Sequence, residues 1–265
     1  MNDISKNQLS FLKKQRANQL FVTSSRLFIF IAFILTWELS TRLGLIDSFI
    51  FSSPSKVALC FWGMLLDKSI FLHIGITLYE TFISFSLVTI LSILLATLLW
   101  FSKKLLEITE PFLVILNSLP KSALAPLLIV WLGATPTTII VAGMSVALFG
   151  SILNMTTSFQ EVDSDKIKLI YTLRGTKVQA LTKVVIPNSV PAIVSNMKVN
   201  IGLCLVGVII GEFLAARNGL GYLIIYSSQV FKMDWLLMSI VILCVLAMGL
   251  YALISAVEKV YQKYF

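Results

Sequence analysis

Charged residues are scarce in this chain of 265 residues. They make up 13% of it, whereas 57% of the residues are apolar and the mean hydropathy is +0.91. Soluble domains carry about 25% charged residues, so this composition excludes an ordinary soluble domain, and the excess apolar surface must face lipid. The net charge of +8 does not indicate a nucleic-acid partner, because the basic residues are spread between apolar runs rather than gathered in one patch.

Residues that perform catalysis are also few. The chain has one histidine, His73, and three isolated cysteines without the spacing of metal ligands, which are interpreted as small hydrophobic residues. No aspartate lies within a long apolar run, which argues against an intramembrane enzyme that uses a nucleophile or a metal. None of the thirteen glycines is followed by lysine, so the chain has no Walker A motif and no cofactor is expected.

Six apolar runs, each close to the roughly 20 residues that cross a bilayer, predict six transmembrane spans. Lipid offers no water to the backbone, so each run should be an α-helix. We therefore predict an all-α polytopic membrane protein with a polar segment over 1–26 and a transmembrane domain over 27–265. The first run is not interpreted as a cleaved signal peptide, because it follows that polar segment and no small-residue cleavage site comes after it. The spans are expected at 27–45, 82–101, 112–133, 137–159, 189–211 and 235–257.

Lysine and arginine set the expected orientation. With six spans both termini lie on one side, and fourteen of the 21 basic residues fall on that side, five on the other and two inside spans. Because loops rich in lysine and arginine stay in the cytoplasm, both termini and the segment 161–187 are predicted to be cytoplasmic.

Two short segments on the outer side look structured. Ser52–Asp67 contains Ser-Pro followed by an apolar stripe, which predicts an amphipathic helix at the interface or against the bundle. Leu220–Phe231 has no charge but is too short to cross, which indicates a re-entrant or interfacial piece.

The cytoplasmic segment 161–187 alternates basic and acidic residues with apolar ones. Asp163 or Ser164 is expected to cap a first short helix, which Gly175 ends in a left-handed conformation. Thr176 to Gln179 has the form of a capping box and starts a second helix that stops before Pro187. This helix pair is either a docking element for a cytoplasmic partner or an ordinary interfacial loop.

The segment from Lys168 to Pro187, KLIYTLRGTKVQALTKVVIP, resembles the EAA loop of binding-protein-dependent ABC importer permeases. That loop reads Glu-Ala-Ala, three residues, Gly, nine residues, Ile, one residue, Leu-Pro. Counted back from Pro187, the family's glycine position falls on Arg174, with Gly175 next to it, and the glutamate position holds Lys168. The spacing is kept, whereas the acidic residue and the glycine position are not.

Three further stretches resemble the nitrate/sulfonate/bicarbonate/taurine branch of that family. In chain order they are FSSPSKV over 51–57, LPKSALAPLLIVWLG over 119–133, and GEF over 211–213 with NGLGYLI over 218–224. The resemblance implies a type I importer permease that is not itself an enzyme. It also implies two copies of a separate ATPase subunit, a second identical permease copy and an extracellular or periplasmic solute-binding protein. The solute would be a small anion such as a sulfonate, taurine, nitrate or bicarbonate, or a compound resembling a thiamine precursor.

The same resemblance implies that the helix pair transmits the motion of the ATPase. Its apolar anchors, rim and turn residues would be Ile170, Leu173, Arg174, Gly175, Thr176, Lys177, Val178 and Pro187.

Ionisable and amide side chains within spans mark a candidate translocation path, because burying them in lipid is costly. In the third span these are Lys121, after the helix-breaking Pro120, with Asn117 and Ser122 beside it; the alternative for Lys121 is snorkelling to a surface. In the fifth span they are Asn196, Lys198 and Asn200, which could equally join helices.

Other polar residues suggest structural roles. Glu212 ends the fifth span and is expected, with Gly219 and Gly221, to support the backbone amides of the re-entrant piece or a gate. Glu38 and Arg42 are four residues apart and should neutralise each other. Small residues at Gly143 and Ala147 and at Gly207 and Gly211 suit close helix packing.

Two other membrane functions remain as alternatives to an importer permease. A secondary transporter would need acidic groups at mid-membrane and internal repeats, and neither is visible in the sequence. A structural membrane subunit without transport activity would have no sequence feature that distinguishes it from a permease.

Overall fold

The computed structural model describes residues 6–264, which are helical throughout apart from short connections. The long helices are amphipathic only weakly, as expected where most of their surface faces lipid rather than water. In chain order the helices are α1 (Lys6–Arg42), α2 (Ser48–Phe51), α3 (Pro54–Leu66), α4 (Ser69–Phe101), α5 (Lys103–Ser118), α6 (Lys121–Leu132), α7 (Pro136–Gln160), α8 (Ser164–Thr172), α9 (Lys177–Ala180), the π-helix η1 (Leu181–Val185), α10 (Ile186–Ala215), α11 (Leu220–Gln229) and α12 (Met233–Tyr264).

Five helical stretches are long and apolar enough to cross a membrane, and the bent pair α5–α6 makes a sixth if it is counted as one span. The all-α fold is therefore confirmed, but several boundaries differ from those expected. The candidate span in α1 starts at Ala17, and the helix itself already begins at Lys6, so much of the polar N-terminal segment is helical. Helix α4 begins at Ser69, thirteen residues before the apolar run 82–101. Ser69, the first residue of α4, donates hydrogen bonds from its hydroxyl and its amide to the Asp67 carboxylate. These bonds lower the pKa of that carboxyl below its usual range.

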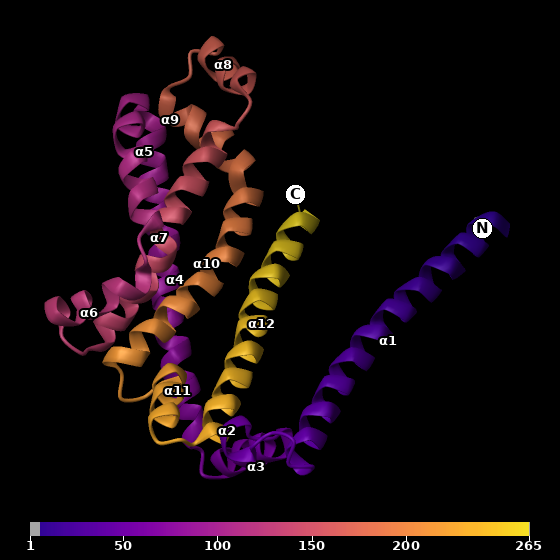
Figure 1. Ribbon diagram of the computed structural model, residues 1–265. Helices are drawn as coiled ribbons and strands as arrows, with labels where there is room; N and C mark the ends of the chain where they lie inside the picture. Colours follow the sequence, from indigo (N-terminus) through magenta and orange to yellow (C-terminus); the bar gives the residue numbers. More distant parts are fainter. Residues whose placement is uncertain (1–5, 265) are drawn as a thin grey trace.

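The third predicted span is not one helix. Its first half belongs to α5, which starts at Lys103 rather than at Phe112 and ends at Ser118. Its second half is α6, which turns away from α5 by 95°. Leu119 and Pro120 form the extended corner between them, because proline disfavours the helical conformation in the residue before it. In Figure 1 α6 lies across the bundle rather than along it.

Helices α4, α7 and α10 form the centre of the bundle (Figure 1). Glycine allows α7 and α10 to approach closely: a Cβ at Gly207 would lie 2.8 Å from the carbonyl oxygen of Ala142 and 2.8 Å from Cα of Gly143. Gly143 in turn faces Ser84 of α4 and Val208 of α10. The small-residue motifs thus serve close helix packing, as expected.

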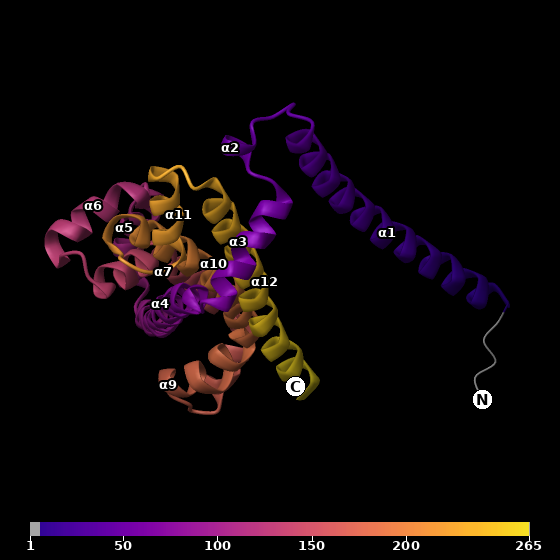
Figure 2. The same cartoon turned by 90° about the horizontal axis from the view of Figure 1, so that it is seen from below.

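Helix α1 stands apart from the rest of the chain, and within its span only Thr41, at the end, is buried (Figures 1 and 2). Its last turn is attached through Glu38, which pairs with Arg42 at 2.7 Å as expected. Glu38 also accepts hydrogen bonds from the amide and hydroxyl of Ser55 at 3.0 and 2.9 Å. The carboxylate therefore connects α1 to the first turn of α3.

The two ends of the bundle differ in character. Helix α3 is the short amphipathic helix expected over Ser52–Asp67. Its Met64 is buried against the core, and burial raises the pKa of the nearby Cys60 thiol to about 11.

Helices α2, α3 and α11 lie at one end of the bundle, whereas α8, α9, the start of α1 and the end of α12 lie at the other (Figure 1). This places both ends of the described chain on the same side as the segment 161–187.

Candidate functional site

The segment between α7 and α10 is a helix pair, as expected from the sequence. We call α8, the connection 173–176 and α9 the α8–α9 element. Asp163 caps α8 by accepting from the amide of Asp165 at 2.9 Å. Thr176 caps α9 in a complete capping box: its hydroxyl accepts from Gln179 N at 3.3 Å, and its amide donates to Gln179 Oε1 at 2.7 Å.

The turn between the two helices corrects the expectation for Gly175. The left-handed residue is Arg174, with φ of +58°, and Gly175 has no positive φ. Arg174 N donates to Tyr171 O at 2.9 Å and Gly175 N to Ile170 O at 2.8 Å, the two bonds of a Schellman motif. Gly175 is instead required by space, since a Cβ there would lie 2.5 Å from Ile170 Cγ2 and 2.8 Å from Ile170 O.

The second helix does not stop before Pro187, which corrects another expectation. The chain runs from α9 through the π-helix η1 into α10, a continuous helical stretch over Lys177–Ala215. In η1 the amide of Ile186 bonds to Leu181 O, five residues back, so the wider turn lies immediately before the proline, which lacks an amide hydrogen. The α8–α9 element therefore continues directly into a membrane span.

Lys177 connects the α8–α9 element to a second span. Its Nζ donates to Phe101 O, the last residue of α4, at 2.7 Å. The ammonium also lies 5.6 and 5.8 Å from the ring centroids of Trp100 and Phe101. A cation at the carbonyl end of a helix is favourable. Lys177 thus contacts its own chain, whereas the sequence suggested a place at the rim of a partner surface.

The α8–α9 element exposes apolar side chains beyond the end of the spans. Leu173 is 72% exposed and Val178 57%, and Leu169 and Tyr171 are exposed beside them. Ile170 is half-buried because it packs over Gly175, and Arg174 and Pro187 are exposed. Of the three expected apolar anchors, Leu173 and Val178 are therefore free to contact another protein.

Lys121 lies at the corner between α5 and α6. Its Nζ donates to Asn117 O at 3.1 Å and to Leu116 O, so it caps the carbonyl end of α5, and it lies 5.5 Å from the Phe149 ring centroid. Asn117, Pro120 and Ser122 are exposed in the single chain. The corner thus presents polar groups on a face that the chain itself leaves uncovered.

The three polar residues of the fifth span have partners within the chain. Asn196 and Asn200 are buried and both donate to Ser151 Oγ of α7, at 2.7 and 2.8 Å. Lys198 forms an ion pair with Glu258 of α12. The sequence suggested that these three residues line an open path, whereas in the structure they bind other helices of the same chain. Sequence reasoning missed Glu258 because it lies one residue beyond the predicted sixth span.

Glu212 is fully buried at the junction of α10 and α11 and holds that junction together. Its carboxylate accepts hydrogen bonds from Thr77 Oγ1 at 2.6 Å and from the amide of Gly221. A Cβ at Gly219 or Gly221 would collide with the Glu212 side chain, and Gly219 also has a φ of +115°. The structure thus shows Glu212 supporting a backbone amide of the short helix, as the sequence suggested.

Sequence reasoning missed the partners of Glu212 on α4. His73 lies 3.1 Å from both the amide and the carbonyl of Gly219, and Thr77 accepts from the amide of Leu220 at 2.8 Å. Glu80 is 2% exposed, and its carboxyl group lies next to that of Glu212. These three residues precede the apolar run at 82, but their spacing of three to four residues places them on one face of a longer helix. Two buried carboxyl groups do therefore lie within membrane helices.

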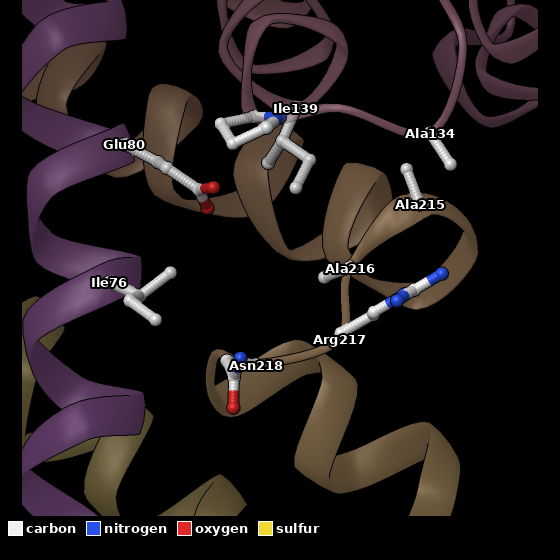
Figure 3. A pocket seen from close by; sticks show the side chains of 9 residues that line it. Ile76, Glu80, Ala134, Ile139, Ala215, Ala216, Arg217 and Asn218 are labelled. Atoms are coloured by element: carbon white, nitrogen blue, oxygen red, sulfur yellow. The ribbon is translucent and has the colours of Figure 1, made fainter.

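A cavity of about 220 Å³ adjoins these residues. Ile76 and Glu80 line it on one side and Ala134 and residues 215–217 on the other, with Ile139 and Asn218 between them (Figure 3). Pro136 also lines it.

Comparison with known proteins identifies relatives of this chain. Residues 88–262 match the family described as binding-protein-dependent transport system inner membrane component. The taurine transport system permease protein TauC of Escherichia coli is 23% identical over 195 residues, 73% of this chain and 70% of that protein. The formylaminopyrimidine transport permease protein ThiX of Halalkalibacterium halodurans is 25% identical over 193 residues, 73% of this chain and 76% of that protein.

The fold also resembles solved structures. The MetNI methionine ABC transporter in an inward-facing conformation contains a chain that matches with a TM-score of 0.61 at 16% identity. The match covers 75% of this chain and 97% of the other.

Proposed function

The chain belongs to the family of binding-protein-dependent transport system inner membrane components, and we propose that it forms the translocation path for a small solute and converts the motion of an ATPase into opening of that path. As a member of the family it is a multi-pass inner-membrane permease subunit of an ATP-binding-cassette importer. It does not hydrolyse ATP itself but works with an ATPase and a solute-binding protein.

One observation supports the proposed coupling role above the others: the α8–α9 element is connected to two central helices. It continues through η1 into α10 and is bonded through Lys177 to the end of α4. Leu173 and Val178 are exposed on the same element and supply apolar anchors for a cleft in the ATPase. A push on the element is therefore passed to α4 and α10, which together hold Glu80 and Glu212 near their far ends.

The path is proposed to run along the corner formed by α5 and α6. Asn117, Pro120, Lys121 and Ser122 lie there, and the exposed faces of both helices are available to a second copy of the chain, so that two copies would enclose the path between them. Two copies of the ATPase would complete the complex. Both termini and the α8–α9 element are proposed to lie in the cytoplasm, in agreement with the distribution of basic residues.

The relatives suggest a small polar solute. TauC is named for taurine and ThiX for a formylaminopyrimidine. Sulfonates, taurine, nitrate, bicarbonate and thiamine-precursor-like compounds therefore form the first set to test.

The proposal is tested by reconstituting the permease with its cognate ATPase and solute-binding protein. Binding-protein-stimulated ATP hydrolysis and ATP-dependent solute uptake are the expected results. Leu173→Asp should reduce co-purification of the ATPase at least tenfold, because it places a charge in the docking cleft. The exposed Thr172→Asp, one residue away, serves as the control and should leave co-purification unchanged. If Leu173→Asp and Thr172→Asp both bind and couple like the wild type, the coupling role is wrong.

A further inference from the structure

Glu80 is a buried carboxyl group without a donor for its Oε2. The side chain is 2% exposed, and Oε2 has no hydrogen-bond partner among the residues that the structure describes. An ionised carboxylate in such a place is costly unless donors or a cation compensate it. Glu80 forms no ion pair within the described range 6–264, and Arg217 lies away from it across the cavity (Figure 3). These surroundings favour the neutral, protonated form of Glu80.

Glu212 has the opposite surroundings. Its Oε1 accepts from the Thr77 hydroxyl at 2.6 Å, and its Oε2 accepts from the amide of Gly221. Thr77 in turn accepts from the amide of Leu220 at 2.8 Å, which polarises its hydroxyl toward Glu212. Leu220 and Gly221 are the first residues of α11, so the carboxyl group of Glu212 lies at the positive N-terminal end of that helix. These donors favour the ionised form of Glu212.

The two carboxyl groups lie next to each other and complement each other. Two ionised carboxylates side by side would repel, so only one of them is charged. With a proton on Glu80, its hydroxyl is a donor and Glu212 is the acceptor. A hydrogen bond of this kind is strong because one partner carries a charge. The opposite arrangement would leave Glu80 ionised without a donor and would place the proton where donors already point.

We propose that Glu80 is a neutral carboxylic acid that donates its proton to Glu212, and that this bond positions the first turn of α11 against α4. The bond joins α4 to α10 through the two glutamates, and Glu212 continues it to the amide of Gly221. Glu80 is thus a positioning residue that acts through Glu212.

The role of this bond in transport follows from the helices that it connects. The α8–α9 element continues into α10 and contacts the end of α4 through Lys177, whereas the two glutamates join the same helices near their other ends. With both contacts in place, α4, α10 and the first turn of α11 move as one unit when the element is pushed. That unit carries the connection 215–218, which lines the cavity. The role in transport rests on the proposed function, whereas the protonation of Glu80 does not.

Infrared spectroscopy tests the protonation directly, because the C=O stretch of a carboxylic acid differs in frequency from that of a carboxylate. The permease–ATPase complex is measured at neutral pH in a detergent without ester groups, whose carbonyls would overlap with the signal. The wild type should show a carboxylic-acid band that is lost in Glu80→Gln. Glu161→Gln, which changes an exposed carboxyl near the opposite end, should keep the band. If the Glu80→Gln spectrum keeps it too, Glu80 is not the protonated group and the inference is overturned.

Hydrogen exchange of the amides of Leu220 and Gly221 measures how firmly the start of α11 is held. Glu80→Gln keeps a donor toward Glu212 and should exchange at the wild-type rate. Glu80→Leu removes the donor and should exchange about tenfold faster, as expected for the loss of one hydrogen bond to a charged group. Equal rates in Glu80→Leu and the wild type, or equally fast exchange in both variants, contradict the positioning role. If Glu80→Leu does not assemble, the spectrum and the exchange rate of Glu80→Gln decide.

Transport is measured on the same complexes after reconstitution with the binding protein. The probe is the member of the first solute set that the wild type takes up, starting with taurine. Glu80→Leu should keep binding-protein-stimulated ATP hydrolysis but take up less solute for each ATP, and Glu80→Gln should restore the wild-type ratio. An unchanged ratio in Glu80→Leu refutes the role in transport. If the binding protein does not stimulate hydrolysis by the wild type, the proposed function fails, whereas the spectrum and the exchange rates still decide the protonation and position of Glu80.

Discussion

The turn between α8 and α9 gives a prediction in which two neighbouring substitutions act in opposite directions. In Gly175→Ala the new Cβ would lie 2.5 Å from Ile170 Cγ2, 2.8 Å from Ile170 O and 3.2 Å from Gln179 Oε1. The Ile170 side chain could rotate, but its carbonyl is held by the bond from Gly175 N at 2.8 Å. Overpacking of this kind costs about 1–3 kcal/mol.

Arg174→Gly should change the stability of the turn in the opposite direction. Arg174 occupies the left-handed region, which costs a residue with a side chain roughly 1–2 kcal/mol. Glycine removes that strain but adds about 0.5–1 kcal/mol of backbone entropy in the open state. The net change should be neutral to stabilising by up to about 1 kcal/mol. Arg174→Ala, which removes the charge but keeps the strain, separates the two effects.

Hydrogen exchange of the amides between 173 and 180, in the purified permease–ATPase complex, measures local opening directly. A cost near 2 kcal/mol should accelerate exchange about 30-fold in Gly175→Ala. Arg174→Gly should exchange at the wild-type rate or more slowly. If Arg174→Gly opens the turn while Gly175→Ala leaves it closed, glycine is needed at 175 for a left-handed conformation and the geometry described above is wrong.

The remaining predictions concern buried polar contacts and topology. Glu212→Gln should destabilise the permease by about 1–3 kcal/mol, because one oxygen that accepts from Thr77 or Gly221 becomes a donor, whereas Glu80→Gln should cost less, and thermal unfolding in detergent compares the two. Lys198→Met and Glu258→Gln should each destabilise the permease, since each single change leaves a half-buried charge unpaired, and the double variant should lose less stability than the sum of the two single losses. If the two losses simply add in this double-mutant cycle, the ion pair contributes nothing. Lys121→Met should lower transport while assembly persists, and normal uptake would remove Lys121 from the path. A cysteine at Ser55 should react with an impermeant thiol reagent in intact cells and one at Ser164 should not; the reverse pattern would invert the proposed orientation.

The fold class was accessible from the sequence because lipid imposes a simple rule on composition, whereas the family came from the resemblance of short motifs such as the segment from Lys168 to Pro187. Any backbone that crosses a membrane must satisfy its own hydrogen bonds, so apolar runs of about twenty residues predict helices without knowledge of their neighbours. The capping box at Thr176 and the pair of Glu38 and Arg42 were equally accessible, because each depends on residues three or four positions apart.

Other features depended on contacts between distant residues. One local feature was missed as well: α8 ends at Thr172, which makes Arg174 rather than Gly175 the left-handed residue after the cap, and the sequence does not fix a helix end to a single residue. The pairing of Glu80 with Glu212 joins helices 132 positions apart in sequence and required α4 to extend beyond its apolar run.

The sequence by itself determined that this chain is a helical membrane protein, because hydropathy and charge act on each segment separately. Only the tertiary structure decided which polar groups are satisfied within the chain. Asn196, Asn200 and Lys198 have partners on α7 and α12, whereas Glu80 retains an oxygen without one. The physical reason is that hydrogen bonds between helices depend on how those helices pack and rotate, which no single segment encodes.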